Sequence, residues 1–173
     1  MQRMKRKNAL SAMLLALAVA LLLSMFMSVA HASTPETVNF TSTQTFTYLS
    51  AMRAGESDNV ILDVIVTATW VGDIAGTSTS DSRWVLHYLP TPGAVGTNNL
   101  HGVNTVSATV DGKSGTLIIL LTASRSPNDV AAHGTWVILS GTDDLANLHG
   151  HGTAGPSGTP GVSAYTGQIH WDP

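Results

Sequence analysis

The 173-residue sequence predicts an all-β protein, and two observations lead to that prediction. Apolar and polar residues alternate in several segments, as they do in strands with one buried face. After residue 32, Ser, Thr, Gly and Val dominate, a composition that favours strands and turns over helices. Clusters of Gly and Pro divide these segments at short intervals. The residues therefore predict seven or eight short strands in one antiparallel barrel or sandwich.

The first 32 residues differ from the rest of the chain. A basic start from Arg3 to Lys7 precedes an apolar run over about residues 9–27, and Ala30-His31-Ala32 offers the small residues that a signal peptidase reads. This pattern predicts a hydrophobic signal helix, cleaved between Ala32 and Ser33, and export to the periplasm or out of the cell. The alternative is an uncleaved membrane anchor, because the run approaches the length of a membrane span.

The remaining residues are expected to form one domain, with an N-terminal segment and first strand at 33–60 and the rest of the barrel at 61–173. Residues 33–173 keep four of the eight basic side chains and all 11 acidic ones. This acidic balance gives no reason to expect nucleic acid or an anionic membrane as a partner. The chain has no cysteine, which excludes disulfides, thiolate metal sites and cysteine nucleophiles.

The clearest strand patterns lie in the middle of the chain. In residues 61–70, the even-numbered apolar residues from Leu62 to Trp70 share one face and Asp63 lies on the other. Residues 103–110 alternate in the same way, and Asp111-Gly112 then predicts a hairpin turn into a strand at 116–122. That strand is apolar on both faces, which indicates cover on both sides or a place in a tightly packed barrel. Further strands are expected at residues 41–49, 77–89, 133–139, 148–154 and 162–171.

Three motifs resemble those of an uncharacterised bacterial family, a domain of unknown function. They are Val71-Gly72-Asp73-Ile74-Ala75-Gly76-Thr77, the stretch from Gly102 through Asp111-Gly112 to Leu117, and the stretch from Gly134 to Gly152. They follow the family's order and cover about residues 61–171. The resemblance implies a small antiparallel β-barrel with a central cavity, similar to allene oxide cyclase or the calycins. It brings no established catalytic residues.

The chain also departs from the family pattern at several positions. It has His149 and His151 where the family tends to have a basic and then an acidic residue. It has Asp143 and Asp144 where the family usually has a glycine at one of the two positions, and it has Tyr165 and Trp171 where the family often ends in a tyrosine-rich strand. The resemblance therefore bears on the fold and adds little about function.

The tryptophans are the candidate ligand-binding residues. If the barrel is hollow, Trp70, Trp84 and Trp136 could line an apolar pocket, although core packing is the simpler interpretation for each of them. We therefore expect an exported protein that binds a small apolar molecule in its interior and needs no cofactor.

Two aspartates are the candidates for an alternative function, that of a cyclase or isomerase using the same cavity. If the strand face that bears Asp63 points into the barrel, this residue would be a buried general base with a raised pKa. Asp73 follows a glycine at a predicted strand end. The simpler interpretation is that both carboxylates face solvent.

A third function, metal binding, is indicated by His149 and His151, which share one face of a strand. A metal would need a third ligand, for which the candidates are His101, His133, His87, His170, Asp143 and Asp144. The simpler interpretations are polar residues on an exposed strand face or histidines that respond to pH. Turn geometry accounts for Asp143-Asp144 better than a calcium site does.

Overall fold

The computed structural model describes residues 33–53, 59–88, 95–129 and 131–173. The predicted leader and Ala32 lie outside the described residues, whereas Ser33 is the first residue described. Among these residues, no helix has the length and apolar character needed to cross a membrane.

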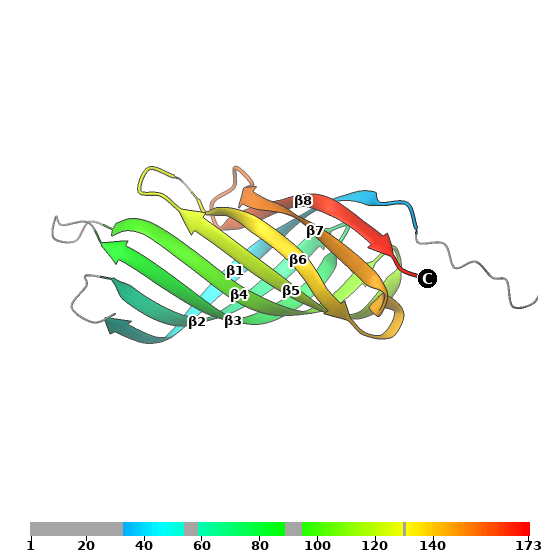
Figure 1. Ribbon diagram of the computed structural model, residues 1–173, viewed down its shortest axis with the longest axis horizontal. Coiled ribbons are helices and arrows are strands. Elements are labelled where there is room, and N and C mark those ends of the chain that lie inside the picture. The colour runs from blue at the N-terminus through cyan, green and yellow to red at the C-terminus, as the bar shows by residue number, and fades with distance from the viewer. Residues whose placement is uncertain (1–32, 54–58, 89–94, 130) are drawn as a thin grey trace, which may run out of the picture. The chain divides into compact units, whose positions relative to one another are not determined.

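Eight antiparallel strands form a closed barrel in which each strand pairs with the next and β8 pairs with β1 (Figure 1). One turn of 3-10 helix, η1 (Asp143–Leu145), follows the sixth strand. The strands are β1 (Glu36–Arg53), β2 (Val60–Gly72), β3 (Ala75–Tyr88), β4 (Val95–Val110), β5 (Lys113–Arg125), β6 (His133–Gly141), β7 (Leu148–Pro156) and β8 (Val162–Trp171). The prediction of an all-β antiparallel barrel is confirmed, and the pairing of β1 with β8 over Glu36–Thr43 closes it.

The predicted alternation decides which side chains enter the barrel. On β2 the even-numbered residues from Val64 to Trp70 are buried, whereas Thr67 and Thr69 are exposed. On β5, Leu117 and Ile119 are buried inside, and Ile118 and Leu120 are half-buried on the outer wall. The apolar character of β5 on both faces thus corresponds to one fully buried face and one partly covered outer face.

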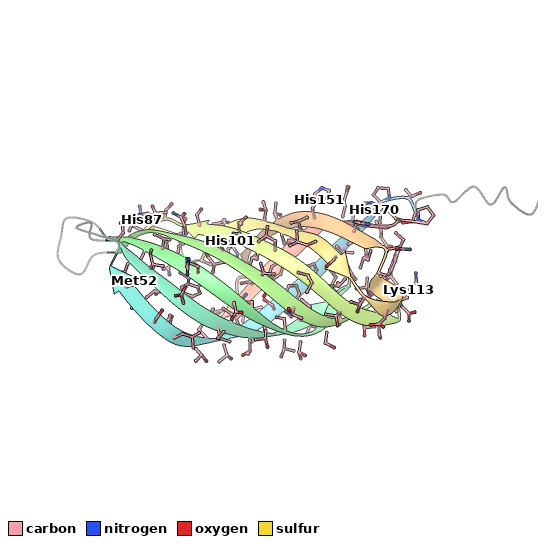
Figure 2. The ribbon with its side chains drawn as sticks, turned by 60° about the horizontal axis from the view of Figure 1, so that its bottom comes forward. Met52, His87, His101, Lys113, His151 and His170 are labelled. Carbon is pink, nitrogen blue, oxygen red and sulfur yellow. The ribbon has the colours of Figure 1, made fainter. Side chains whose placement is uncertain are left out.

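The two ends of the barrel differ. Met52 and His87 lie at one end and Lys113 at the opposite end (Figure 2), and we refer to them as the Met52 end and the Lys113 end. Interior residues next to the Lys113 end are almost completely buried, among them Ile74, Val110, Leu117, Leu145 and Leu148. Burying each such side chain stabilises the fold by about 1.5–3 kcal/mol. Leu145 belongs to η1, so this short helix contributes to the packing at that end.

Four aromatic rings fill the interior between these residues and the middle of the barrel. Phe40 stacks on Tyr165 and Trp70 with ring centroids 4.8 and 5.3 Å away, and Trp136 meets Phe40 edge-on at 5.4 Å. The central cavity that the family resemblance implied is therefore filled with side chains in this half of the barrel.

Two glycines make room for the Trp136 indole. A Cβ atom at Gly152 would lie 2.7 Å from Trp136 Nε1, and one at Gly167 would lie 2.5 Å from Trp136 Cζ2. Both glycines stand on the inward face of neighbouring strands, because Gly152 pairs with Gly167 across β7 and β8 and with Trp136 across β6 and β7. Their lack of side chains lets the largest residue of the chain fit inside a narrow barrel.

The predicted hairpin turn between β4 and β5 is also present. Asp111 and Gly112 have φ angles of 51° and 75°, the left-handed conformation that a two-residue hairpin requires at both positions. Asp143 has a similar φ of 53° at the start of η1. Asp143-Asp144 therefore begins a helical turn, in line with the preference for turn geometry over a calcium site.

Candidate functional site

Three aromatic side chains gather on the inward-facing side of the strands toward the Met52 end. Phe46 and Tyr48 come from β1, where they pair with the buried residues Val66 and Val64, and Trp84 comes from β3. The ring centroid of Trp84 lies 5.3 Å from that of Phe46 and 6.1 Å from that of Tyr48, in edge-to-face geometry. We call these three residues the aromatic cluster.

The aromatic cluster is accessible, unlike the packed rings of the other half. Phe46 is 40% and Tyr48 61% exposed, and Trp84 is half-buried. These are large apolar surfaces left open to water on the side of the sheet that otherwise forms the core. An accessible aromatic surface of this kind is typical of sites that receive apolar molecules.

Two buried polar atoms next to the aromatic cluster lack a hydrogen-bond partner. They are Nε1 of Trp84, a donor, and Oδ1 of Asn98, an acceptor. Asn98 pairs with Leu86 on β3, and Leu100 pairs with Trp84, so Asn98 and Trp84 are diagonal neighbours on the inward face. An unpaired buried polar group costs about 1–3 kcal/mol. A molecule from outside the chain that bonded to either atom would remove this cost.

Small polar side chains cover the interior deeper than the aromatic cluster. Ser80, Ser82 and Asn104 are all buried, and the hydroxyl groups of Ser80 and Ser82 lie 3.1 Å apart. Asn104 Nδ2 donates to the carbonyl oxygen of Ile119 at 3.4 Å. A Cβ atom at Gly102 would lie 2.4 Å from Ser82 Oγ, so a larger residue at this position would force the Ser82 hydroxyl to move.

A second polar group joins the first strand to the last. Tyr165 Oη on β8 lies 3.1 Å from Ser42 Oγ on β1, and Gln44 Nε2 donates to both atoms at 3.2 and 3.1 Å. Burial raises the pKa of the Tyr165 hydroxyl, an effect that its hydrogen bonds to Ser42, Ser163 and Gln44 partly oppose. The phenol is therefore held in its neutral form inside the barrel.

The three candidate tryptophans have different surroundings. Trp70 and Trp136 are 4% and 1% exposed and belong to the core. Their indole N–H groups are satisfied within the chain, by Ser78 Oγ at 2.8 Å and by the carbonyl oxygen of Thr166 at 3.3 Å. Trp84 alone of the three combines partial exposure with an unpaired N–H group.

Asp63 faces the outside of the barrel. Arg83 Nε donates to Asp63 Oδ1 at 3.0 Å, and Ser50 Oγ donates to Oδ2 at 3.0 Å. The hydrogen bond from Arg83, followed by that from Ser50, lowers the pKa of Asp63, the opposite of the raised pKa considered for a buried base. Asp73, in the turn after β2, accepts a hydrogen bond from the backbone N–H of Asn39 at 2.7 Å.

The histidines also lie on the outer wall. His149 and His170 stack with ring centroids 5.4 Å apart, and their Nε2 atoms lie 3.2 and 3.5 Å from the two carboxylate oxygens of Asp172. His151 and His170 lie toward one end of the barrel and His101 lies farther along it (Figure 2). No group of three or more His, Asp or Glu side chains in the described ranges is arranged to hold a metal ion.

The structure does bring Asp63 and His101 into one surface groove, although the sequence considered them for separate roles. Arg83 pairs with Asp63 on one side and with His101 on the other, across β2, β3 and β4. Together with Leu49 and Asp81 they line a groove of about 420 Å³. None of the buried residues in the described part of the chain is Asp, Glu or His.

Sequence reasoning missed Phe46, Tyr48 and Asn98. The alternation Thr45-Phe46-Thr47-Tyr48 places the two aromatic residues on one face, which was a usable signal. Asn98 had no such signal in the sequence, because only the pairing of β3 with β4 places it next to Trp84.

Comparisons with known proteins find a family profile and solved structures that resemble this chain. The profile of the family described as "Protein of unknown function (DUF3224)" matches residues 33–165. The crystal structure of a DUF3224 protein of unknown function from Shewanella oneidensis is similar, with a TM-score of 0.64, 14% identity, and 81% of this chain and 98% of that chain covered. The pterocarpan synthase dirigent protein GePTS1 gives a TM-score of 0.45 at 13% identity, covering 85% of this chain and 95% of that one. Comparison with curated proteins finds no match.

Proposed function

Because this chain belongs to the DUF3224 family, whose function is unknown, we propose a function from its own residues: the barrel binds a small apolar molecule against the aromatic cluster. The observation that carries this proposal is the exposure of Phe46 and Tyr48 on the inward-facing side of the strands, beside the half-buried Trp84. Burying such rings against a ligand is favourable in proportion to the apolar area removed from water.

The other half of the barrel supports the same location. Phe40, Trp70 and Trp136 are packed against one another and leave no comparable exposed ring surface. A ligand would therefore contact the strands toward the Met52 end, with Trp84 as the residue between the surface and the polar interior.

The test measures binding of phenylnaphthylamine, a neutral apolar dye that fluoresces when it leaves water. We expect Trp84→Ala and Tyr48→Ala each to weaken binding about tenfold, because an aromatic contact contributes about 1–2 kcal/mol. Leu139→Ala removes an exposed apolar side chain elsewhere, 52% exposed, and serves as the matched control. Unchanged dye binding in both aromatic variants, with circular dichroism showing an intact fold, would contradict the proposal.

We also propose that the protein is exported and that its leader is removed after Ala32. This is supported by the pattern of residues 1–32 and by the position of Ser33, which exchanges hydrogen bonds with Trp171 at the end of β8. The residue after the expected cleavage site is thus hydrogen-bonded to the last strand, and β1 begins three residues later, at Glu36. Mass spectrometry of protein recovered from the cell envelope or medium should give an N-terminus at Ser33, and an intact N-terminus would refute cleavage.

A further inference from the structure

Trp84 and Asn98 offer a complementary pair of unused hydrogen-bonding atoms. The indole Nε1–H can only donate, and the amide Oδ1 can only accept. Both atoms are buried, and neither has a hydrogen-bond partner among the residues that the structure describes. The other buried polar side chains nearby, Ser80, Ser82 and Asn104, bond to protein atoms instead.

The pairing of β3 and β4 explains why these two atoms have no hydrogen-bond partner in the neighbouring strand. Trp84 stands directly opposite Leu100, which has no polar atom, and Asn98 stands opposite Leu86. Diagonal neighbours on one face are separated by roughly 7–8 Å between backbones, so the two side chains are close enough for one bridging group to bond to both. A hydroxyl group accepts one hydrogen bond and donates another, and it therefore matches both atoms at once.

We propose that the ligand of the barrel is an apolar molecule that carries a hydroxyl group, which accepts from Trp84 Nε1–H and donates to Asn98 Oδ1. This inference rests on the proposed function and specifies the chemistry of its ligand. The aromatic cluster would hold the apolar body, and the donor–acceptor pair would select molecules with the hydroxyl group over plain hydrocarbons. Sites with unpaired buried polar groups discriminate strongly against ligands that leave them unpaired.

Three probes of similar size test this inference: benzyl alcohol, benzyl methyl ether and toluene. The alcohol both donates and accepts, the ether only accepts, and toluene does neither. We expect benzyl alcohol to bind about fivefold more tightly than the ether after allowance for their partition from water, and the ether to bind more tightly than toluene. The alcohol and the ether should both shift the indole N–H proton signal of Trp84 in nuclear magnetic resonance spectra.

Two variants assign the effect to its atoms. Trp84→Phe keeps an aromatic ring but loses the donor, so it should remove the advantage of the ether over toluene. Asn98→Leu should remove the advantage of the alcohol over the ether. The matched controls are Trp171→Phe, at the Lys113 end, and Asn99→Leu, whose amide Nδ2 lies 2.9 Å from His87 Nε2 on the outer wall.

The outcomes separate this inference from the proposed function. Equal affinity of the three probes for the wild-type protein, or an unmoved Trp84 indole signal, overturns the inference and leaves the proposed function intact. Failure of phenylnaphthylamine and of all three probes to bind overturns the proposed function itself. Selectivity that survives in both Trp84→Phe and Asn98→Leu shows that other atoms read the hydroxyl group, which also overturns the inference.

Discussion

Asp63 and Arg83 face each other across β2 and β3 on the outer wall of the barrel. Their ion pair has an N–O distance of 3.0 Å, and the side chains are 38% and 65% exposed. Exposed pairs of this kind contribute little to stability, because water screens their attraction. The pair nevertheless lowers the pKa of Asp63, and that effect can be measured directly.

We predict that Arg83→Gln raises the pKa of Asp63 toward its ordinary value. The folded-state pKa is lowered in the wild type, so the small stabilisation from this carboxylate is present above about pH 3.9 and is lost as the pH falls through the folded value. The side-chain carboxyl carbon signal of Asp63, followed by nuclear magnetic resonance between pH 2 and 6, reports the change. Arg125→Gln, at a distant arginine, should leave the titration as it is, and an unmoved Asp63 titration in Arg83→Gln would refute the assignment.

At the scale of the elements, the packing of β7 and β8 depends on Gly152 and Gly167. The Trp136 indole lies directly against the backbone at these two glycines. A Cβ atom at Gly152 would meet not only this indole but also the carbonyl oxygen of Thr166, at 2.1 Å. The neighbouring backbone cannot yield easily, because Gly152 takes part in the ladders between β6 and β7 and between β7 and β8.

We predict that Gly152→Ala destabilises the fold by about 1–3 kcal/mol, as expected for an overpacked interior. Gly155→Ala, on the same strand, is the control, since its Cβ atom would only approach His133 Nδ1 at 3.4 Å, an ordinary contact. Urea unfolding of the two variants, compared at equal m values, measures the difference. Equal free energies of unfolding would show that the Trp136 packing is more adaptable than the distances suggest.

The barrel as a whole depends on contact between its first and last strands. β1 and β8 pair from Glu36 to Thr43, and inside the barrel Ser42, Gln44 and Tyr165 add hydrogen bonds between these strands. Because residues 42 and 165 are far apart in the chain, this contact forms only when the barrel closes. The buried hydroxyl of Tyr165 links closure of the barrel to pH.

We predict that stability decreases as the pH rises above about 10, the ordinary pKa of tyrosine. The folded pKa of Tyr165 is raised, so unfolded chains lose this proton first and the equilibrium shifts toward them until the pH exceeds the folded value. Tyr165→Phe should cost about 1 kcal/mol at neutral pH and reduce this alkaline loss. Thermal unfolding between pH 8 and 12 measures both effects. Tyr48→Phe, at an exposed tyrosine, should leave the alkaline loss unchanged, whereas an identical loss in Tyr165→Phe would contradict the prediction.

The sequence by itself determined that the chain forms strands and which residues of a predicted strand share a face, because period-two alternation is a local property that burial on one side of a sheet imposes. It was enough to place Trp70 inside the barrel, to locate the turn at Asp111-Gly112, and to recognise the family from three motifs. Only the tertiary structure decided which interior half is packed and which aromatic rings remain accessible. Strand register decides that Trp84 stands opposite Leu100 and that the amide oxygen of Asn98 has no hydrogen-bond partner. Closure of the barrel brings Ser42 into contact with Tyr165. Register and closure bring together residues from distant parts of the chain, and no local pattern encodes that proximity.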